Sequence, residues 1–464
     1  MPLIKSISGI RGTIGGKPGL TLSPLDVVKF TAAYATWMKR NFSGSDAPKI
    51  VIGRDGRISG EMVQQLVIAT LNAVGVDVIN LDFSTTPTVE MGVIFEKAAG
   101  GIILTASHNP KEWNALKLLN AAGEFLTAAD GAEVLDIAEK EAFDFVPVNK
   151  LGKCTANNTI LARHIDAVVK YPLVKINAIK RKNFKIVVDG INSTGAVAVP
   201  ELLEALGVKP ENITVLNKEV NGEFAHNPEP LPSHLVGLCG EVQKLQADLG
   251  IAVDPDVDRL CFVCEDGSMF GEEYTLVAVA DYVLQHKKGN TVSNMSSTRA
   301  LRDVTEKAGG KYFASAVGEV NVVAKMKAVN AVIGGEGNGG VIVPDLHFGR
   351  DALIGIALFL SLLARHKSAK HLRSLYPSYF ISKNKIELSE GVNISKIFKH
   401  IETKYKKNPI NKEDGLKIEF DKDWVHLRTS NTEPIIRIYA ESSSPTTADN
   451  IAKRMIDDIK EAME

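Results

Sequence analysis

The stretch GIILTASHNPKEWNALK, residues 101–117, carries a serine at the end of an apolar run and surrounds it with turn-forming residues. The apolar start, Gly101–Leu104, predicts a short buried strand, and residues 105–110 predict a tight loop. Ser107 is therefore expected where a strand opens into a cleft, and a hydroxyl there can act as a nucleophile or phosphoryl carrier. The alternative, an Asn-Pro turn in which Ser107 only caps a neighbouring element, stays open at this point.

Two neighbours in the sequence can activate Ser107. Lys117 follows ten residues later, and His108 is adjacent in the chain. Because adjacent side chains on an extended loop diverge, we favour Lys117 over His108 as the activating group.

The surrounding sequence alternates strands and helices. Apolar periodicity predicts a helix from Pro24 to Arg40, a strand at 49–53, a helix from Gly60 to Val74 and a strand at 76–81. This alternation is typical of a parallel α/β sheet. Arg54 and Arg57 follow the strand at 49–53, where such sheets bind ligands, so anion contacts and plain surface charge are both open for them.

The same theme recurs twice along the chain. A second unit begins with NFKIVVDG at 183–190, and a third contains a helix at 272–285 and a strand at 290–296. From about Ala369 onward, short alternating strands and a closing helix at 447–463 predict a smaller domain. The expected fold class is α/β, with three similar mixed α/β domains and a smaller α+β domain at the C-terminus.

Composition indicates a globular protein of several domains. A length of 464 residues exceeds what one hydrophobic core supports, and the chain has 45% hydrophobic and 23% charged residues. The net charge of -1 argues against a general polyanion binder, so we expect no nucleic-acid partner. We expect no membrane segment and a cytoplasmic location, because no apolar run reaches about 18 residues. Cys261 and Cys264 lie in an alternating segment and are expected to be buried thiols rather than metal ligands.

Three carboxylates follow the apolar run GIAV at alternate positions, namely Asp254, Asp256 and Asp258. Carboxylates spaced in this way can converge into an oxygen-rich site that suits Mg2+. Arg259 follows directly and can hold a phosphate oxygen opposite the metal. Three solvated charges in a loop is the alternative, but acidic loops seldom start directly from a buried strand.

A glycine-rich loop, GGEGNGG at 334–340, also follows an apolar run. Its two polar side chains, Glu336 and Asn338, can accept and donate hydrogen bonds to vicinal sugar hydroxyls. A flexible connector is the alternative. Downstream, His347, Arg350 and Asp351 are expected to line the same pocket, where His347 and Arg350 would bind substrate.

Two further stretches offer donors for an anion. RTSNTEP at 428–434, followed by Arg437, combines guanidinium, hydroxyl and amide groups with turn-forming backbone, which is typical of a phosphate cradle. A surface hairpin is the alternative. Near the N-terminus, Arg11 lies between glycines that let the backbone approach an anion.

With four such loops in this order, the chain closely resembles the α-D-phosphohexomutases. The motifs are TASHNP at 105–110, DPDVDR at 254–259, GEGNGG at 335–340 and RTSNTEP at 428–434. The resemblance spans essentially the whole chain and implies four domains around a central cleft, each contributing one loop. The limits we expect are 1–150 with a phosphoserine loop, 151–256 with a metal loop, 257–370 with a sugar-recognition loop and 371–464 with a phosphate-binding loop.

The resemblance also implies roles for individual residues. Ser107 would carry the phosphoryl group, and the three aspartates would hold Mg2+ together with its phosphate. Arg11, Lys117 and Arg259 match catalytic positions, with Lys117 as the favoured general acid or base and His108 as a further catalytic candidate. The residues that match the sugar-recognition and phosphate-binding loops are Glu336, Asn338, Arg428, Ser430, Asn431, Thr432 and Arg437.

Two features depart from the family pattern. Many relatives have serine where Asn338 stands and histidine where Gly340 stands, so the proton-transfer role given to that histidine must fall to His347 or Lys117. The GIRG start and the GEGNGG loop look most like archaeal-type phosphoglucosamine mutases, whereas SNTEP is more like phosphomannomutase/phosphoglucomutase enzymes.

The activity implied by the resemblance is an isomerisation. The enzyme would interconvert the 6-phospho and 1-phospho forms of a hexosamine or hexose through a phosphoserine and a bisphosphorylated sugar. Phosphoglucosamine mutase is the first expectation, and phosphomannomutase/phosphoglucomutase is the alternative. A sugar-phosphate phosphatase and a non-catalytic sugar-phosphate sensor are the less favoured alternatives. The partners are then the sugar phosphate and the bisphosphate, and the chain is expected to be a monomer or homodimer.

Overall fold

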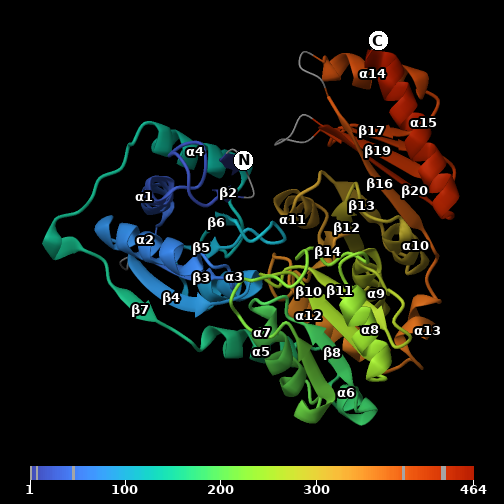
Figure 1. The fold of residues 1–464 in the computed structure, drawn as a ribbon, viewed down its shortest axis with the longest axis horizontal. Helices are drawn as coiled ribbons and strands as arrows, with labels where there is room; N and C mark the ends of the chain where they lie inside the picture. The colour runs from blue at the N-terminus through green and yellow to red at the C-terminus, as the bar shows by residue number, and fades with distance from the viewer. Residues whose placement is uncertain (1–2, 7–8, 44–47, 389–391, 430–434, 464) are drawn as a thin grey trace.

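The structure, a computed structural model, describes residues 3–6, 9–43, 48–388, 392–429 and 435–463. These residues form four sheets that follow one another along the chain, with helices packed on their faces (Figure 1). The first sheet lies on the left of Figure 1 and the fourth at the upper right, with the second and third between them. The expected fold class, three mixed α/β domains and a smaller α+β domain, is confirmed.

The first sheet has the strand order β1-β2-β6-β5-β3-β4-β7. Its strands are β1 (Ile4–Ser6), β2 (Gly9–Thr13), β3 (Lys49–Arg54), β4 (Asp77–Phe83), β5 (Gly100–Leu104), β6 (Trp113–Leu119) and β7 (Cys154–Ala156). Its helices are α1 (Pro24–Asn41), α2 (Gly60–Ala73), α3 (Thr86–Glu96) and α4 (Ala128–Glu139). The start of α1 is fixed by Ser23 and Asp26, which form a capping box, and by a proline at its first position.

The second and third sheets have four strands each, in the orders β11-β10-β8-β9 and β13-β12-β14-β15. The second contains β8 (Ile186–Asp189), β9 (Ile213–Leu216), β10 (Leu249–Val253) and β11 (Leu260–Cys264). The third contains β12 (Asn290–Asn294), β13 (Tyr312–Ser315), β14 (Ala331–Glu336) and β15 (Gly340–Ile342). The accompanying helices are α5 (Ile160–Lys170), α6 (Ile176–Lys182), α7 (Gly195–Ala205), α8 (Val236–Lys244), α9 (Glu272–His286), α10 (Ala300–Lys307), α11 (Glu319–Ala328), α12 (Ala352–Leu363) and α13 (Ala369–Arg373).

The fourth sheet is antiparallel throughout, in the order β16-β20-β19-β18-β17. Its strands are β16 (Phe380–Glu387), β17 (Ile410–Asn411), β18 (Leu416–Glu419), β19 (Trp424–Thr429) and β20 (Ile435–Ser442), and its helices are α14 (Ile394–Lys404) and α15 (Pro445–Met463). The two helices pack their apolar stripes against the sheet and bury a separate core that includes Ile401, Ile438 and Met455. The fourth domain therefore has its own hydrophobic core.

The first three domains share one strand arrangement. In each, two strands flank a central strand in parallel, and a fourth strand returns antiparallel beside one of them: β6-β5-β3-β4, β11-β10-β8-β9 and β15-β14-β12-β13. The returning strand forms a hairpin with the strand before it. The hairpin loops are 105–112, 254–259 and 337–339, so three of the four functional loops expected from the sequence occupy the same place in the repeated unit.

Each of these hairpin loops contains a residue in the left-handed region: Ser107 (φ 50°), Val257 (φ 62°) and Gly339 (φ 86°). For the serine and the β-branched valine this conformation is strained, and strain of this kind persists only where surrounding contacts hold the backbone. At Gly339 a side chain would collide with the Leu260 carbonyl, so only glycine lets the third loop pack on the end of the second.

The first and second sheets extend past the expected domain limits at residues 150 and 256. β7 pairs with β4, and β11 pairs with β10 across the aspartate loop. The sequence did not predict β7, which runs parallel to β4. The segment of β11 fell beyond the second limit because the pattern of a returning strand does not say which sheet it joins.

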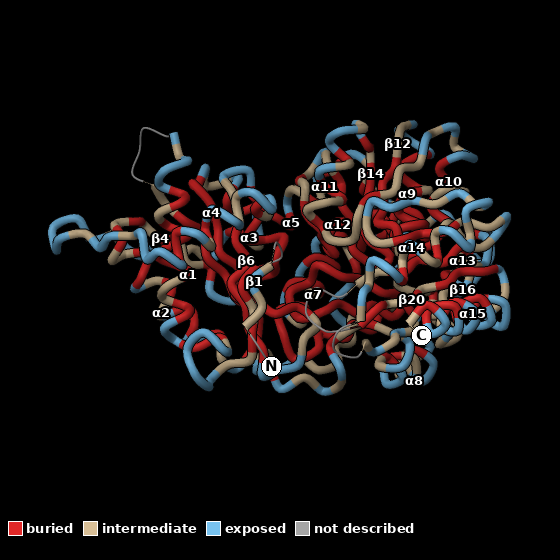
Figure 2. Tube along the Cα trace, turned by 90° about the horizontal axis from the view of Figure 1, so that it is seen from above, coloured by how far each residue is buried: buried red, intermediate tan, exposed pale blue. Residues whose placement is uncertain are grey.

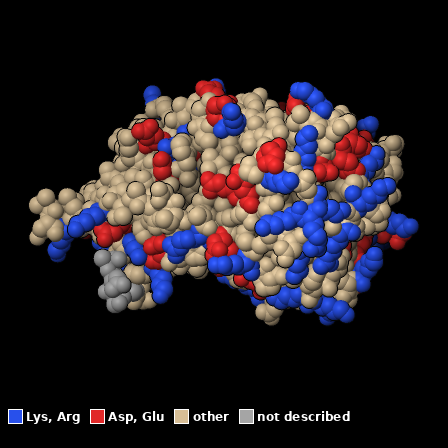
Figure 3. All heavy atoms as spheres, turned by 90° about the horizontal axis from the view of Figure 1, so that it is seen from below, with Lys and Arg blue, Asp and Glu red and all other residues tan. Residues whose placement is uncertain are grey.

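The interior consists of apolar strands covered by helices, and the exposed residues lie on the outer helices and loops (Figure 2). Every residue of α12 is buried, and this helix contacts α5, α6, α7 and α9, which joins the second and third domains through one core. Cys261 and Cys264 are buried free thiols in β11, as expected. Among the described helices, none combines the length and apolar character needed to cross a membrane. On the face in Figure 3, basic side chains are densest on the right-hand half.

Arg57 holds the loop that carries Ser107. This side chain is buried, and its Nε donates to Asp55 Oδ2 (3.1 Å) while its Nη atoms donate to four backbone carbonyls of the loop. The acceptors are the carbonyls of Ser107 (2.5 Å), Asn109 (2.7 Å), Pro110 (2.7 Å) and Trp113 (2.9 Å). All five guanidinium donors are thus satisfied, so Arg57 is a structural clamp, and the anion contact left open for it is not made here.

We predict that Arg57→Lys lowers the free energy of unfolding by about 2 to 4 kcal/mol, because an ammonium cannot reach this fork of acceptors and leaves buried carbonyls unpaired. Urea denaturation checks this, with the exposed Arg181→Lys as a control that should change stability by less than about 0.5 kcal/mol. Equal stability of the two variants would show that the clamp does not hold the loop.

Candidate active site

Loops from all four domains line one cleft of about 490 Å³. Its lining includes Arg11, Ser107, His108 and Lys117 from the first domain, Glu229 and Arg259 from the second, Asn294, Glu336, Asn338 and Arg350 from the third, and Lys383, Arg428 and Arg437 from the fourth. The structure therefore brings together residues that lie more than 400 positions apart, from Arg11 to Arg437.

Ser107 is buried at the base of the cleft, and its hydroxyl donates to Asp254 Oδ2 over 2.6 Å. Its backbone N–H donates to Thr105 Oγ1 (2.9 Å), and that hydroxyl donates to Asp55 Oδ2 (2.6 Å). His108 Nδ1 lies 3.4 Å from Ser107 Oγ. The serine oxygen is thus fixed between a carboxylate and an imidazole.

Asp254, Asp256 and Asp258 are all fully buried, and one oxygen of each lies within 4.8 Å of the others. Asp256 Oδ1 and Asp258 Oδ1 are buried without a hydrogen-bond partner. Burial, together with the charges of Asp258 and Asp256, raises the pKa of Asp254. Three converging carboxylates with unused oxygens fit a hard divalent cation, which would relieve this repulsion.

The aspartate loop is held by groups from the other domains. Thr86, at the start of α3, donates through its backbone N–H to the Asp256 carbonyl (2.8 Å) and through its hydroxyl to Asp256 Oδ2 (2.5 Å). Ser193 donates to the Pro255 carbonyl (2.6 Å), and the Ala352 N–H donates to the Val257 carbonyl (3.2 Å). The loop therefore keeps its shape through contacts with the first and third domains as well as its own.

Lys117 projects from β6 toward the same aspartates. Its ammonium lies 2.7 Å from Asp256 Oδ2 and 3.5 Å from Asp258 Oδ2. Burial opposes the charged form, but Asp256 and Asp258 outweigh it and raise the pKa of Lys117. Lys117 is therefore protonated in this structure, which suits a role as a proton donor or as a positive charge opposite the aspartates.

Arg350 bridges the aspartate loop and the sugar-recognition loop. Its guanidinium pairs with Asp258 (2.7 Å), Glu319 (2.9 Å) and Glu336 (2.8 Å). Although burial opposes it, Arg350 holds the pKa of Asp258 below its ordinary value. Arg350 thus sets the distance between the two loops.

Glu336 is oriented from three sides. Besides Arg350, it accepts from Asn294 Nδ2 (2.8 Å) and from the Gly318 N–H (3.0 Å), while Asn338 Oδ1 accepts from the Gly340 N–H (3.2 Å). These contacts make the loop from β14 to β15 a shaped surface, not a flexible connector.

Three arginines, Arg11, Arg259 and Arg437, gather in the cleft, and Arg259 also pairs with Glu229 Oε1 (3.2 Å). Burial and the charges of Arg437 and Arg259 lower the pKa of Arg11, so these three guanidiniums repel one another. The Nε atoms of Arg11 and Arg259 are buried without a hydrogen-bond partner. Burial and Arg259 also lower the pKa of His108, which keeps its ring neutral. Converging guanidiniums that repel one another and keep unused N–H donors form a site for an anion such as a phosphate.

The fourth domain contributes Arg428 and Arg437 to the cleft. Arg428 Nε pairs with Asp414 Oδ2 (2.9 Å), and Asp414 also accepts from the Val317 N–H (2.9 Å) of the third domain. This places the arginine at the contact between the third and fourth domains. Ser430, Asn431 and Thr432, expected in the same phosphate-binding loop, lie outside the described residues.

His347 is the expected substrate-binding residue that the structure does not bring to the cleft. Its side chain is buried against Asp351 (3.3 Å) and Glu90 (3.2 Å), at the junction of the first three domains. The difference arises because the segment between β15 and α12 turns inward at His347 and places Arg350, three residues later, at the cleft. Any proton transfer expected of His347 therefore falls to groups that line the cleft.

Several cleft residues were missed in the sequence. Glu319, Glu273, Asn294, Lys383 and Tyr439 all line the cleft. Asn294 is the last residue of β12 and Glu319 lies shortly after β13, so the rule that ligands bind at strand ends gave a signal for both. Glu273, Lys383 and Tyr439 gave none, because they lie inside regular elements that only the tertiary fold turns toward the cleft.

Comparison with known proteins agrees with this geometry. Sequence models of the phosphoglucomutase/phosphomannomutase family match all four parts of the chain: alpha/beta/alpha domain I at residues 3–145, domain II at 162–267, domain III at 271–379 and the C-terminal domain at 385–458. The four matched ranges follow one another along nearly the whole chain.

Relatives match over nearly the full length. A phosphoglucomutase/phosphomannomutase of Thermococcus kodakarensis is 34% identical, and a phosphoglucosamine/phosphogalactosamine mutase of Sulfurisphaera tokodaii is 30% identical, each over 98% of both chains. The crystal structure of a putative phosphomannomutase from Thermus thermophilus superposes with a TM-score of 0.81 at 22% identity, covering 98% of this chain and 99% of that one. The chain therefore belongs to the phosphoglucomutase/phosphomannomutase family and is a phosphohexomutase.

Proposed function

We propose that this phosphohexomutase interconverts glucosamine 6-phosphate and glucosamine 1-phosphate, through phosphorylated Ser107 and a bisphosphorylated sugar. The observation that carries the proposal is the 2.6 Å contact between Ser107 Oγ and Asp254, at the base of a cleft that also holds the arginine cluster and the glycine-rich loop. A nucleophile, a candidate cation site and two anion-binding groups thus face one volume.

The reaction would proceed in two phosphoryl transfers. First, the bond between phosphorus and Ser107 Oγ breaks as a free sugar hydroxyl attacks phosphorus, which yields the bisphosphorylated sugar. After the intermediate has turned in the cleft, the other phosphate is attacked by Ser107 Oγ, and the isomerised monophosphate leaves. Such transfers need mainly positioning and charge neutralisation, which Arg11, Arg259 and Lys117 are placed to give.

Asp254, Asp256 and Asp258 would hold Mg2+, which would neutralise charge on the transferring phosphoryl oxygens. Proton transfer has two carriers in the cleft. His108 is neutral and lies 3.4 Å from Ser107 Oγ, so it can accept a proton, while the protonated Lys117 can donate one.

The choice of glucosamine is supported by Glu273. This carboxylate lines the cleft and faces the glycine-rich loop, because a side chain at Gly337 would collide with it. Its hydrogen bond comes from the Thr298 N–H (2.9 Å), and burial raises the pKa of Glu273 to about 8. The ammonium group of an amino sugar would complement it. The 34% identity to a phosphoglucomutase/phosphomannomutase favours hexose phosphates as the second candidate.

Ser107→Ala tests the covalent step. Without the carrier hydroxyl, we expect isomerisation to fall at least about a thousandfold, and no phosphate should be incorporated at this loop. Coupled assays and intact-mass measurement report the two quantities. Isomerisation at the full rate would exclude the mechanism, and steady release of phosphate without isomerisation by the unmodified enzyme would indicate a phosphatase.

Asp254→Asn tests the cation site. Removal of one of three ligands should weaken Mg2+ binding by at least about tenfold in calorimetric titrations, while the exposed Asp136→Asn should bind Mg2+ like the unmodified chain. If both variants bound Mg2+ with the same affinity, the aspartate loop would not be the metal site.

Glu273→Gln tests the sugar. We expect KM for glucosamine 6-phosphate to rise about tenfold and KM for glucose 1-phosphate to change less than about twofold, because only the amino sugar loses an ionic partner. The neighbouring Glu272→Gln is the matched control, and an equal effect on both sugars would support the hexose alternative.

A further inference from the structure

A second cluster of metal-ligating side chains lies apart from the aspartate loop, where the first three domains meet. His164 projects from α5, and His347 and Asp351 come from the segment that leads into α12; all three are buried. Asp351 Oδ2 lies 3.0 Å from His164 Nε2 and 3.3 Å from His347 Nε2, and the three ligand atoms are within 4.8 Å of one another.

These spacings match those of a tetrahedral zinc site. Ligands about 2.0 to 2.1 Å from a tetrahedral ion are about 3.3 Å apart, which is close to both observed separations. Two imidazoles and a carboxylate favour Zn2+ over Mg2+, which prefers oxygen ligands.

The other nitrogen of each imidazole also has a partner. Thr88 Oγ1 lies 3.0 Å from His164 Nδ1, and Glu90 Oε2 lies 3.2 Å from His347 Nδ1. Both partners come from α3 and can accept a hydrogen bond from an Nδ1–H, which leaves Nε2 free to bind a cation. Hydroxyl or carboxylate partners of this kind orient the histidine ligands of metal sites.

Asp351 is oriented in the same way. Its Oδ1 accepts from the Leu353 N–H (2.8 Å) and caps α12, so Oδ2 is the oxygen that faces both histidines. Its position is therefore fixed by the helix and not by the cluster.

Protons can also compensate the carboxylates of the cluster: burial raises the pKa of Glu90 to about 8, and Asp351 and Glu90 raise the pKa of His347 to about 10 although burial opposes this. Glu90 is fully buried. Its Oε2 lies 3.2 Å from His347 Nδ1, and neither of its oxygens makes a hydrogen bond of good geometry. With Asp351 it brings two carboxylates to two histidines. A divalent cation bound by neutral imidazoles would take the place of these protons and balance both carboxylates.

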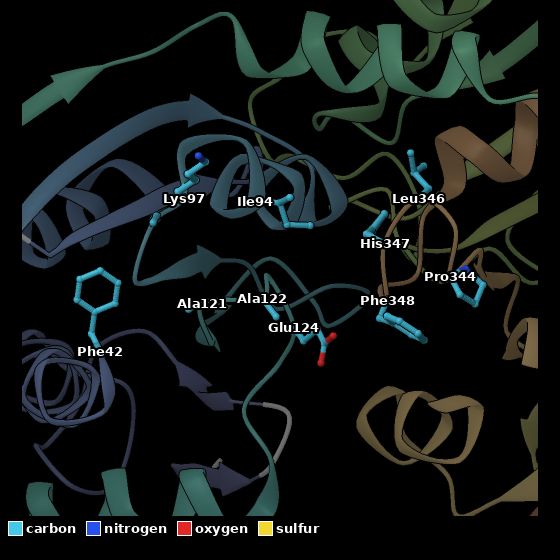
Figure 4. A pocket seen from close by; sticks show the side chains of 11 residues that line it. Phe42, Ile94, Lys97, Ala121, Ala122, Glu124, Pro344, Leu346, His347 and Phe348 are labelled. Atoms are coloured by element: carbon cyan, nitrogen blue, oxygen red, sulfur yellow. The ribbon is translucent and has the colours of Figure 1, made fainter. Parts of the chain in front are cut away.

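A pocket of about 520 Å³ lies beside the cluster. His347 forms part of its wall, together with Leu346 and Phe348 from the same segment and Ile94 from α3 (Figure 4).

We propose that His164 Nε2, His347 Nε2 and Asp351 Oδ2 bind a Zn2+ ion, with Glu90 and Thr88 as the groups that orient the two rings. The ion joins the second and third domains directly and the first through α3. Because α3 also carries Thr86, which holds Asp256, the site anchors the helix that supports the catalytic aspartate loop. Its role is structural.

The test is a titration of the metal-stripped full chain with Co2+, in excess Mg2+ so that the aspartate loop is occupied. We expect about one Co2+ per chain with the intense visible absorption of a four-coordinate site, which Zn2+ abolishes by displacement. Only the weak absorption of six-coordinate Co2+, or no binding, would overturn the proposal and leave the cluster as a metal-free hydrogen-bonded network.

Variants locate the ion. His164→Gln and His347→Gln should weaken Zn2+ binding at least about a hundredfold and remove the increase in unfolding temperature that Zn2+ gives the unmodified chain. Glu90→Gln, which keeps all three ligands, should weaken binding about tenfold, and the exposed His371→Gln should not change it. Unchanged Zn2+ affinity in His347→Gln and Glu90→Gln would place the ion elsewhere. Should a histidine variant fail to fold, the Co2+ spectrum of the unmodified chain still decides.

Discussion

The structure depends on how the charge of three buried aspartates is compensated. Carboxylates this close repel one another, and burial removes the water that would screen them. Compensation comes from Lys117 of the first domain, Arg259 beside the loop and Arg350 of the third domain. Each of these cations belongs to a different domain. The ion pairs that offset the repulsion among the aspartates therefore also hold the first three domains around the loop.

The repeated unit explains why these domains can share one site. Each presents a hairpin loop at the same end of the same strand arrangement, and each loop uses a left-handed residue to turn. One loop supplies the hydroxyl, the next the carboxylates and the third the glycine-rich surface with Glu336. Chemistry is thus divided among three copies of one structural element, and the fourth domain adds arginines from a different fold.

Much of this could be predicted from the sequence because the chemistry follows apolar strands. Ser107 and the aspartates stand directly after such runs, and strand ends are where α/β sheets bind ligands. The partners of those residues were harder to find. Arg57 looks like a surface charge or an anion ligand in the sequence, but the fold buries it under the serine loop. His347 and Arg350 both follow the glycine-rich loop closely in the sequence. The structure places His347 at the domain junction and Arg350 in the cleft.

The reason is physical: a side chain's partner is set by packing between domains, which local periodicity does not encode. The serine loop shows this most clearly. Its left-handed backbone, its clamp and the carboxylate beside its hydroxyl come from three separate parts of the chain. The sequence predicted Ser107 and Asp254 as functional residues, but neither the clamp by Arg57 nor the left-handed backbone of the loop.

The central claim is that the Ser107 oxygen carries the phosphoryl group that appears on the sugar. A single-turnover experiment tests it most directly: enzyme with an isotopically labelled phosphate on Ser107 is mixed with unlabelled glucosamine 6-phosphate and quenched over milliseconds. The account predicts that the label leaves the serine at least as fast as kcat and appears first in the sugar bisphosphate. Label that stays on the protein through many turnovers, or leaves only as inorganic phosphate, would contradict it.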